Sequence, residues 1–277
     1  MNYRNRALNH LKKYKKDNLL DIPNGSYRGK FHEHILPKKL QEKNFLESYR
    51  NDILKSNLYD VSKLHTYFNH LNSSQAMCFN FFYPLYHEKK LELVLNFLGI
   101  ENEKVNYETV CFEKDGKDGD KIKRRPTSFD FYFKTESGKE IFFEIKYTEG
   151  EFGKAKDDDE HKEKFKEIYS NHLLPLNENF RSREKFFENY QICRNLIHIE
   201  ENSFVVFIYP TNNKKISEGA SKAKSEILTT RFINNFFSAT WEALFENIMH
   251  SVTEEKLKKQ LDEFKNKYIA IEENACS

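Results

Sequence analysis

Two carboxylates and an ammonium group stand in the most strand-like part of this chain, the segment FDFYFKTESGKEIFFEIK at residues 129–146. Asp130 lies near its start, and Glu144 and Lys146 lie near its end. Two neighbouring carboxylates repel each other unless a positive group lies between them. A hard divalent cation, held by one or two carboxylates with water and a substrate phosphate, meets that requirement. These residue types therefore suggest metal-assisted chemistry on a phosphate.

The alternation of side chains along a strand predicts that these three groups lie together. Ser137 and Gly138 mark a turn, and a turn centred there places Asp130 opposite Glu144 or Lys146. The other face of the hairpin then carries six apolar residues: Phe129, Phe131, Phe133, Ile141, Phe143 and Ile145. A slip of one residue would mix the two sets, so the apolar pattern itself fixes the register. The alternative is that the charged residues only form the solvated face of a hairpin.

The flanking segments predict the elements that position this hairpin. Residues 72–98 have helical periodicity that ends at Gly99, and residues 105–113 predict a strand. After the hairpin, residues 181–200 predict a helix, and FVVFIYP at 204–210 predicts a strand buried on both faces. The order helix, three strands, helix, strand and helix indicates an α/β fold with a central mixed sheet.

The remaining segments are predicted to be mainly helical. They are residues 1–70, with a break at DIPNGSYRGK and a second helical stretch at 37–54, residues 222–245, and the C-terminal stretch. Their sequence contains neither an internal repeat nor a linker rich in Pro, Gly and Ser, so it marks no clear domain boundary.

Composition limits the class of protein. With 277 residues, 38% of them hydrophobic and 25 of them Phe, the chain can bury a large aromatic core. It has no apolar run of the roughly 20 residues that a membrane helix needs, and its basic N-terminus does not resemble a secretory signal. Four scattered cysteines predict neither a zinc cluster nor a disulfide framework and favour the cytoplasm. A net charge of +2 means that any nucleic-acid binding depends on local patches.

The motif and the element order together resemble the PD-(D/E)xK nuclease superfamily. Its pattern places an Asp on one strand and (D/E)xK on the next, as in Asp130 and the run Glu144-Ile145-Lys146. Pro126 lies four residues before the aspartate instead of next to it, a departure that many members tolerate. LNSSQAMCFNFFYPL and FFEIKYTEGEFGKAK also look similar to a bacterial restriction-endonuclease-like group of that superfamily.

The resemblance implies a restriction-endonuclease-like αβββαβ core, with a central mixed sheet flanked by helices, over roughly residues 75–215. It further implies a nuclease-like domain at 71–277 with a helical N-terminal extension at 1–70 and a helical C-terminal extension. In such a fold Asp130 and Glu144 would hold Mg²⁺, with Mn²⁺ as a substitute. Lys146 would orient or deprotonate the attacking water.

Members often add residues from the neighbouring helices. Glu88 is the candidate from the preceding helix, three residues before Leu91 on the core-facing stripe; the alternative is a capping or surface glutamate. Gln191 and Arg194 are the candidate polar pair on the following helix, where they are three residues apart and share a face. The alternative for this pair is a solvated helix face.

Basic residues supply further candidates for contacts with phosphates. Lys123, Arg124 and Arg125 lie in the loop before Asp130, where an ordinary solvated loop is the alternative. The cluster Lys12, Lys13, Lys15 and Lys16 is interpreted as a basic helix surface rather than as a DNA-binding site.

The resemblance thus implies a cytoplasmic, Mg²⁺-dependent nuclease that hydrolyses DNA phosphodiester bonds in restriction or anti-phage defence. DNA is the expected partner, a homodimer would suit double-strand cutting, and a companion methyltransferase or defence protein is a further candidate. The alternative function is that of a non-catalytic nucleic-acid-binding or structural member of the same fold in a defence or repair complex.

Overall fold

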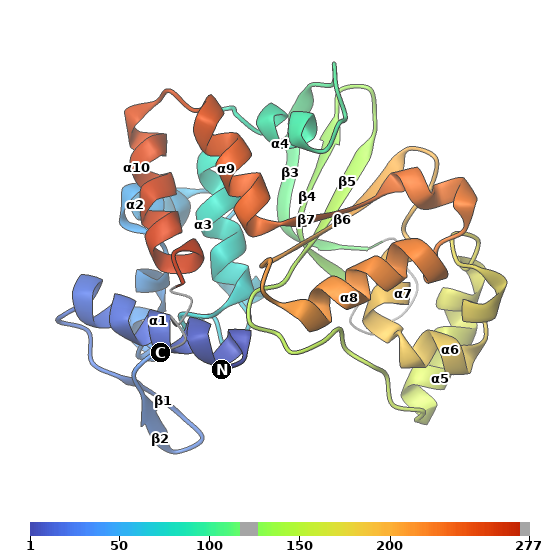
Figure 1. Cartoon of the computed structure of the whole chain (residues 1–277), viewed down its shortest axis with the longest axis horizontal. Coiled ribbons are helices and arrows are strands. Elements are labelled where there is room, and N and C mark those ends of the chain that lie inside the picture. The colour runs from blue at the N-terminus through green and yellow to red at the C-terminus, as the bar shows by residue number, and fades with distance from the viewer. Residues whose placement is uncertain (117–126, 272–277) are drawn as a thin grey trace. The chain divides into compact units, whose positions relative to one another are not determined.

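The computed structural model describes residues 1–116 and 127–271 (Figure 1). Its contacts divide the chain into two compact units. The sheet unit comprises Asn102–Thr240, and the helical unit combines Met1–Glu101 with Trp241–Ser277. The sequence led us to expect a boundary at residue 70, whereas these units meet at residues 101–102 and 240–241. The boundary at residue 70 stays an expectation.

The sheet unit is built on five strands in the order β3-β4-β5-β6-β7 (Figure 1). The bounds are β3 (Val105–Asp115), β4 (Ser128–Thr135), β5 (Glu140–Ile145), β6 (Ser203–Tyr209) and β7 (Phe236–Thr240). The pairings β3–β4 and β4–β5 are antiparallel, whereas β5–β6 and β6–β7 are parallel. The expected α/β class with a central mixed sheet is therefore confirmed.

Helices of the same unit cover one face of this sheet. Their bounds are α5 (Asp159–Glu167), α6 (Arg183–Glu188), α7 (Tyr190–Leu196) and α8 (Lys214–Lys222). Side chains of α7 and α8, such as Leu196 and Ile216, are buried in one cluster with Phe142 and Val205 of the strands. The expected single helix at 181–200 is instead two, α6 and α7, separated at Asn189.

The strands have the buried character that their sequence predicts. β6 lies between two parallel neighbours, and Val205, Val206 and Phe207 are fully buried. Alternate side chains point to opposite faces, so a strand with consecutive buried residues is covered on both sides. The expectation of a doubly buried strand at FVVFIYP is confirmed.

The hairpin of β4 and β5 has the predicted turn. Phe131 pairs with Phe143 and Phe133 with Ile141, a register centred on residue 137. Gly138 has φ +91° and its amide donates to the Thr135 carbonyl at 3.0 Å. Gly accepts this left-handed conformation without the steric cost of a Cβ.

One of the six residues assigned to the apolar face points to the other side. Phe131 contacts Phe133 and Phe143, but the ring of Phe129 lies 4.9 Å from that of Phe142, within the cluster beneath α7. Tyr132 also belongs to that cluster, so the regular alternation of faces is broken between Phe129 and Tyr132, opposite Glu113 of β3, which has φ 52°. The face that carries Glu144 is therefore also apolar and buried.

The segment at 222–245 is not a continuous helix, as had been expected. Ala223–Ile227 is a π-helical turn, Thr230–Asn235 is a 3₁₀ helix and Phe236–Thr240 is strand β7, before α9 begins at Trp241. The five residues of β7 are held by parallel pairing to β6, from Val205 with Phe236 onward. Pairing with a distant strand decided their conformation, as is common for short segments.

The helical unit contains six α-helices among its described residues. They are α1 (Tyr3–Asn18), α2 (Glu47–Lys55), α3 (Ser74–His87), α4 (Glu92–Phe97), α9 (Trp241–Ser251) and α10 (Glu255–Phe264). The expected helix at 72–98 is divided into α3 and α4, and Gly99 with φ +72° follows the second, as predicted. Trp241 packs against Phe81 and Phe264 in the core of this unit.

A small antiparallel ribbon also belongs to the helical unit. Its strands are β1 (Gly25–Tyr27) and β2 (Lys30–His32), where the sequence had predicted only a break between helices. No helix among the described residues is long and apolar enough to cross a membrane.

Candidate active site

The candidate site lies where strands β4 and β5 separate. Their pairing extends to Phe131 with Phe143, and one residue beyond lie Asp130 and Glu144. The backbone amide of Ile145 donates to the Asp130 carboxylate at 2.6 Å. The side chain of Asp130 thus takes the place of a main-chain acceptor on β4, and it is fixed beside the end of β5.

Glu144 is held by three donors in a buried position. Its side chain is only 6% exposed. Oε1 accepts hydrogen bonds from Lys146 Nζ at 2.7 Å and from Gln191 Nε2 at 2.8 Å, and Oε2 accepts one from Asn195 Nδ2 at 2.9 Å. Such charge-assisted bonds fix the orientation of a carboxylate. The structure therefore brings together Asp130, Glu144, Lys146 and Gln191, as the sequence predicted.

Helix α7 supplies the two amide side chains. Gln191 and Asn195 are four residues apart and lie on the same helix face, which points to β5. The Gln191 Oε1 atom accepts from the amide of Gly153 at 3.1 Å, so its Nε2 atom is directed to Glu144. Sequence reasoning missed Asn195, although its spacing from Gln191 in YQICRNL was the available signal.

Lys146 is the cation of this group. Its side chain is 8% exposed, it directly follows β5, and its backbone amide continues the sheet by donating to the Ile208 carbonyl at 2.9 Å. Burial lowers the pKa of Lys146, but attraction by Glu144, Glu149 and Asp130 outweighs this and leaves the pKa above its usual value. Lys146 therefore carries its proton at neutral pH.

Asp130 experiences the opposite balance. Burial raises its pKa well above the usual range, and repulsion from Glu144 and Glu113 adds to the effect. The amide of Ile145 and the charge of Lys146 oppose it only in part. The pair of carboxylates thus carries more negative charge than its surroundings stabilise.

This excess of negative charge is what a divalent cation would relieve. Among the described residues there is no group of three or more His, Cys, Asp or Glu side chains that could hold a metal ion. Mg²⁺ does not need one, because it is commonly bound by one or two carboxylates with water and substrate phosphate. A carboxylate has about four acceptor positions, and Glu144 uses three of them for the donors above. The two carboxylates therefore fit a Mg²⁺ ion that keeps several water ligands, and not an ion that is enclosed by protein ligands alone.

Arg194 does not share the position of Gln191. Its guanidinium lies over the ring of Tyr190, 5.3 Å from the ring centroid. Burial lowers the pKa of Arg194, but interactions with Tyr190, Tyr169 and Glu144 together outweigh it and leave the pKa raised. Arg194 is thus a nearby positive charge rather than a hydrogen-bond partner of Glu144.

The other candidates lie elsewhere in the chain. Glu88 belongs to the helical unit, at the C-terminal end of α3, where it accepts a hydrogen bond from Tyr49 Oη at 2.5 Å. This contact agrees with the alternative of a capping glutamate, and its part in catalysis stays a prediction. Lys123, Arg124 and Arg125 lie outside the described residues.

Comparison with known families gives one match. A family model described as "Restriction Endonuclease associating with ARP" matches residues 6–269, nearly the whole chain and both of its units. No curated protein and no solved structure matches the chain significantly.

Proposed function

The chain belongs to the family of restriction endonucleases associating with ARP, and from this premise we propose that it is a Mg²⁺-dependent nuclease of the PD-(D/E)xK type. Its substrate would be the phosphodiester bonds of DNA, in restriction or another form of defence. The observation that carries the proposal is the meeting of Asp130, Glu144 and Lys146 at the separating ends of β4 and β5.

Each residue of the site has a role that follows from its contacts. Asp130 and Glu144 would hold the metal ion. Mg²⁺ bound there would supply positive charge for the scissile phosphate and lower the pKa of a bound water. Protonated Lys146 would add positive charge close to the phosphate and orient the attacking water, rather than act as a base in the resting site.

The amides of α7 would act as positioning residues. Gln191 and Asn195 donate to both oxygens of Glu144 without adding charge, so they fix the carboxylate while leaving its negative charge available to a cation. Outer partners of this kind typically influence metal affinity or activity by about 10- to 100-fold.

The family description also suggests an association with ARP, and we propose such a partner for this chain. Because a restriction enzyme must spare the DNA of its own cell, a companion methyltransferase is a second proposed partner.

Plasmid cleavage tests the proposal. The wild-type chain should cut plasmid DNA with Mg²⁺ and not with EDTA, and Mn²⁺ should substitute. Asp130→Asn should reduce cutting by on the order of 10²–10³, the loss typical of removing one group that stabilises charge in an active site. Glu218→Gln, an exposed carboxylate on α8, is the matched control and should cut like the wild type.

Two outcomes would contradict the proposal. Cutting by Asp130→Asn at the wild-type rate would exclude Asp130 as a metal ligand. DNA binding without cutting under any metal condition would instead favour a non-catalytic member of the family.

A further inference from the structure

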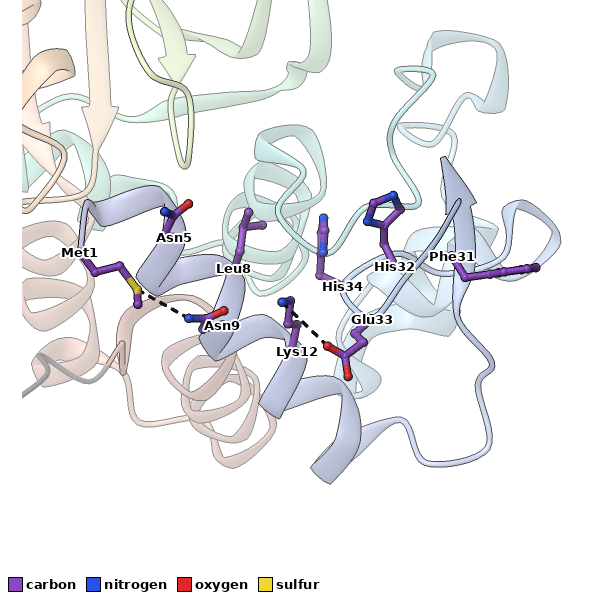
Figure 2. Close-up of a pocket in the computed structure, with 9 residues that line it drawn as sticks. All are labelled: Met1, Asn5, Leu8, Asn9, Lys12, Phe31, His32, Glu33 and His34. Atoms are coloured by element: carbon purple, nitrogen blue, oxygen red, sulfur yellow. Dashed lines mark hydrogen bonds and ion pairs between the residues drawn. The ribbon is translucent and has the colours of Figure 1, made fainter. Parts of the chain in front are cut away.

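The first part of the helical unit has a local excess of positive charge. Residues 1–39 contain ten Lys and Arg but only three Asp and Glu, whereas the whole chain has a formal net charge of only +2. This segment folds into α1 and the ribbon of β1 and β2 (Figure 2). A local excess of positive charge on a nearly neutral chain is the electrostatic pattern of a site for a polyanion.

The lysines of α1 divide into two groups. Lys15 is buried and donates to the carbonyls of Pro23 and Ile35 and to the side chain of Asn24, so it anchors the segment that leads into the ribbon. Lys12 and Lys16 point outward and lie 3.8 and 3.6 Å from Glu33. One carboxylate shared by two lysines leaves a net positive charge beside the ribbon.

The tip of the ribbon has an arginine where the turn itself would favour another residue. Arg28 has φ 51° and Gly29 has φ 76°, as in a two-residue type I′ turn. Such turns prefer Asn-Gly, because a left-handed conformation is unfavourable for a long side chain. Arg28 and Lys30 are both exposed. The turn therefore carries two exposed cations, although its left-handed conformation is unfavourable for the Arg28 side chain.

Phe31 is exposed on one face of the ribbon. It is 77% exposed, and Figure 2 shows its ring pointing away from α1 and from the histidines of the ribbon. It pairs with Ser26, whereas Tyr27 and His32 lie on the opposite face, where their rings are 6.3 Å apart. A large exposed aromatic side chain next in the chain to the cationic tip of the ribbon suits stacking on a base or a sugar.

The opposite face of the ribbon is held rigidly by aromatic contacts. The ring of Tyr27 lies 5.4 Å from Tyr67 and 5.4 Å from His70, both edge to face. His34, whose ring lies 6.2 Å from that of His70, has a pKa lowered to about 4 by burial and by neighbouring positive charge. These contacts position the ribbon, and its positive charge comes from Lys and Arg.

A pocket of about 400 Å³ lies between α1 and the ribbon (Figure 2), and Met1, Leu8 and Phe31 form the apolar part of its lining. The amide side chains of Asn5 and Asn9 and the ammonium group of Lys12 line it, together with His32 and Glu33. Amide and ammonium donors are the groups that contact phosphate oxygens in protein–DNA complexes.

We propose that the β1–β2 ribbon enters the major groove of duplex DNA. The major groove of B-DNA is wide enough for a two-stranded ribbon. Arg28 and Lys30 would pair with phosphates at the sides of the groove, and Phe31 would lie against the bases. The inference rests on the proposed function in one respect, since it takes the duplex to be the substrate of this chain.

Fluorescence anisotropy with a labelled short duplex tests the ribbon in EDTA, where no cutting is expected. The test uses the full chain with two changes, Arg28→Asn with Lys30→Gln, and Phe31→Ala. Asn suits the left-handed turn position, so the first change removes charge without adding strain. Matched controls are Lys258→Gln with Lys259→Gln, exposed on α10, and Leu174→Ala, which is 60% exposed.

The two changes should have different signatures. Arg28→Asn with Lys30→Gln should weaken binding about tenfold and reduce the slope of log affinity against log salt by about 0.9 for each lost phosphate contact. Phe31→Ala should weaken binding about five- to hundredfold with the slope unchanged, as for the loss of one stacked base. Phe31→Tyr should bind like the wild type. All variants should show the circular dichroism spectrum of the wild type.

Three results would overturn the inference. The first is that both ribbon variants bind DNA with the affinity and salt slope of the wild type. The second is that the Lys258 and Lys259 control loses as much DNA affinity as the ribbon variants do. The third is that the ribbon variants still bind DNA but no longer bind a protein partner. The last result would make the ribbon a protein-docking surface. Because binding is measured without cutting, a loss in the ribbon variants would stand even if Asp130→Asn cut DNA normally, and that second result would fail only the proposed function.

Discussion

At the scale of residues, the site consists of two carboxylates and one ammonium group in buried positions. Lys146 is the positive partner that Glu144 contacts directly, and its attraction to three carboxylates keeps it protonated despite burial. Gln191 and Asn195 fill two further acceptor positions of Glu144 with neutral donors, which leaves about one position for a metal ion. If they were charged, they would compete with a cation for Glu144. Asp130 is left as the residue that its surroundings stabilise least.

The raised pKa of Asp130 gives a prediction about stability. Between the ordinary Asp pKa of about 3.9 and the raised value, the folded chain binds more protons than the unfolded chain, so stability falls as pH increases through this window. Asn cannot ionise and can still accept from the amide of Ile145. In EDTA, Asp130→Asn should therefore melt at a higher temperature than the wild type at neutral pH, and the difference should vanish in acid.

Thermal unfolding monitored by circular dichroism checks this, with Glu218→Gln as the control. Adding Mg²⁺ should stabilise the wild type more than Asp130→Asn, since a ligand that binds only the folded state raises its stability. A variant that is less stable than the wild type in EDTA at neutral pH would contradict the assigned charge balance.

At the scale of elements, the site depends on where strands and helices stop. β4 and β5 separate after Phe131 and Phe143, and the free edge between them is occupied by the side chain of Asp130. α7 begins at Tyr190, after the break at Asn189, and this break allows its face to meet β5 independently of α6. The end of the β4–β5 pairing thus places Asp130 in the candidate site, and the break before α7 places Gln191 and Asn195 there.

The packing of α8 is a second constraint on the site. A Cβ added at Gly219 would lie 2.6 Å from a ring atom of Phe152, and the ring of Phe152 lies 5.4 Å from Lys146 Nζ. Gly219→Ala should therefore displace Phe152, destabilise the protein by about 1–3 kcal/mol and slow cutting. Chemical denaturation and the plasmid assay measure the two effects.

Gly150→Ala is the matched control, because nothing lies within 4 Å of the added carbon. It should leave stability and cutting close to wild-type levels. If Gly219→Ala behaves like this control, Phe152 does not constrain Lys146.

At the scale of the whole molecule, the family match spans both compact units. It covers residues 6–269, so the helical unit with its basic ribbon lies within the matched residues, as the sheet unit does. Under our two proposals, the sheet unit would cut DNA and the helical unit would bind it.

Double-strand cutting gives a prediction at this scale. In the proposed mechanism one group of Asp130, Glu144 and Lys146 would act on one strand at a time, so cutting both strands in one binding event would call for two copies of the chain. We expect a homodimer on duplex DNA, which sedimentation of the Asp130→Asn variant with DNA would detect. Sedimentation as a monomer, together with cutting of both strands in one binding event, would contradict this.

The sequence alone determined the features that depend on local patterns. The period-two alternation and the turn at Ser137 and Gly138 predicted that Asp130 lies opposite Glu144 or Lys146, and the structure has the register centred on residue 137. The resemblance to the nuclease superfamily implied a polar residue from the following helix, and Gln191 contacts Glu144. Such signals extend over only a few residues and are therefore visible in the chain itself.

The tertiary structure decided what depends on distant partners. Asn195 contacts Glu144 across 51 residues, β7 exists because β6 pairs with it, and Phe129 packs with Phe142 in the cluster beneath α7 and not with Phe131. The ribbon of β1 and β2 likewise depends on the buried Lys15 and on the rings of Tyr67 and His70. Each of these outcomes results from packing between segments far apart in the chain, so a local pattern, such as the spacing of Gln191 and Asn195, does not by itself decide it.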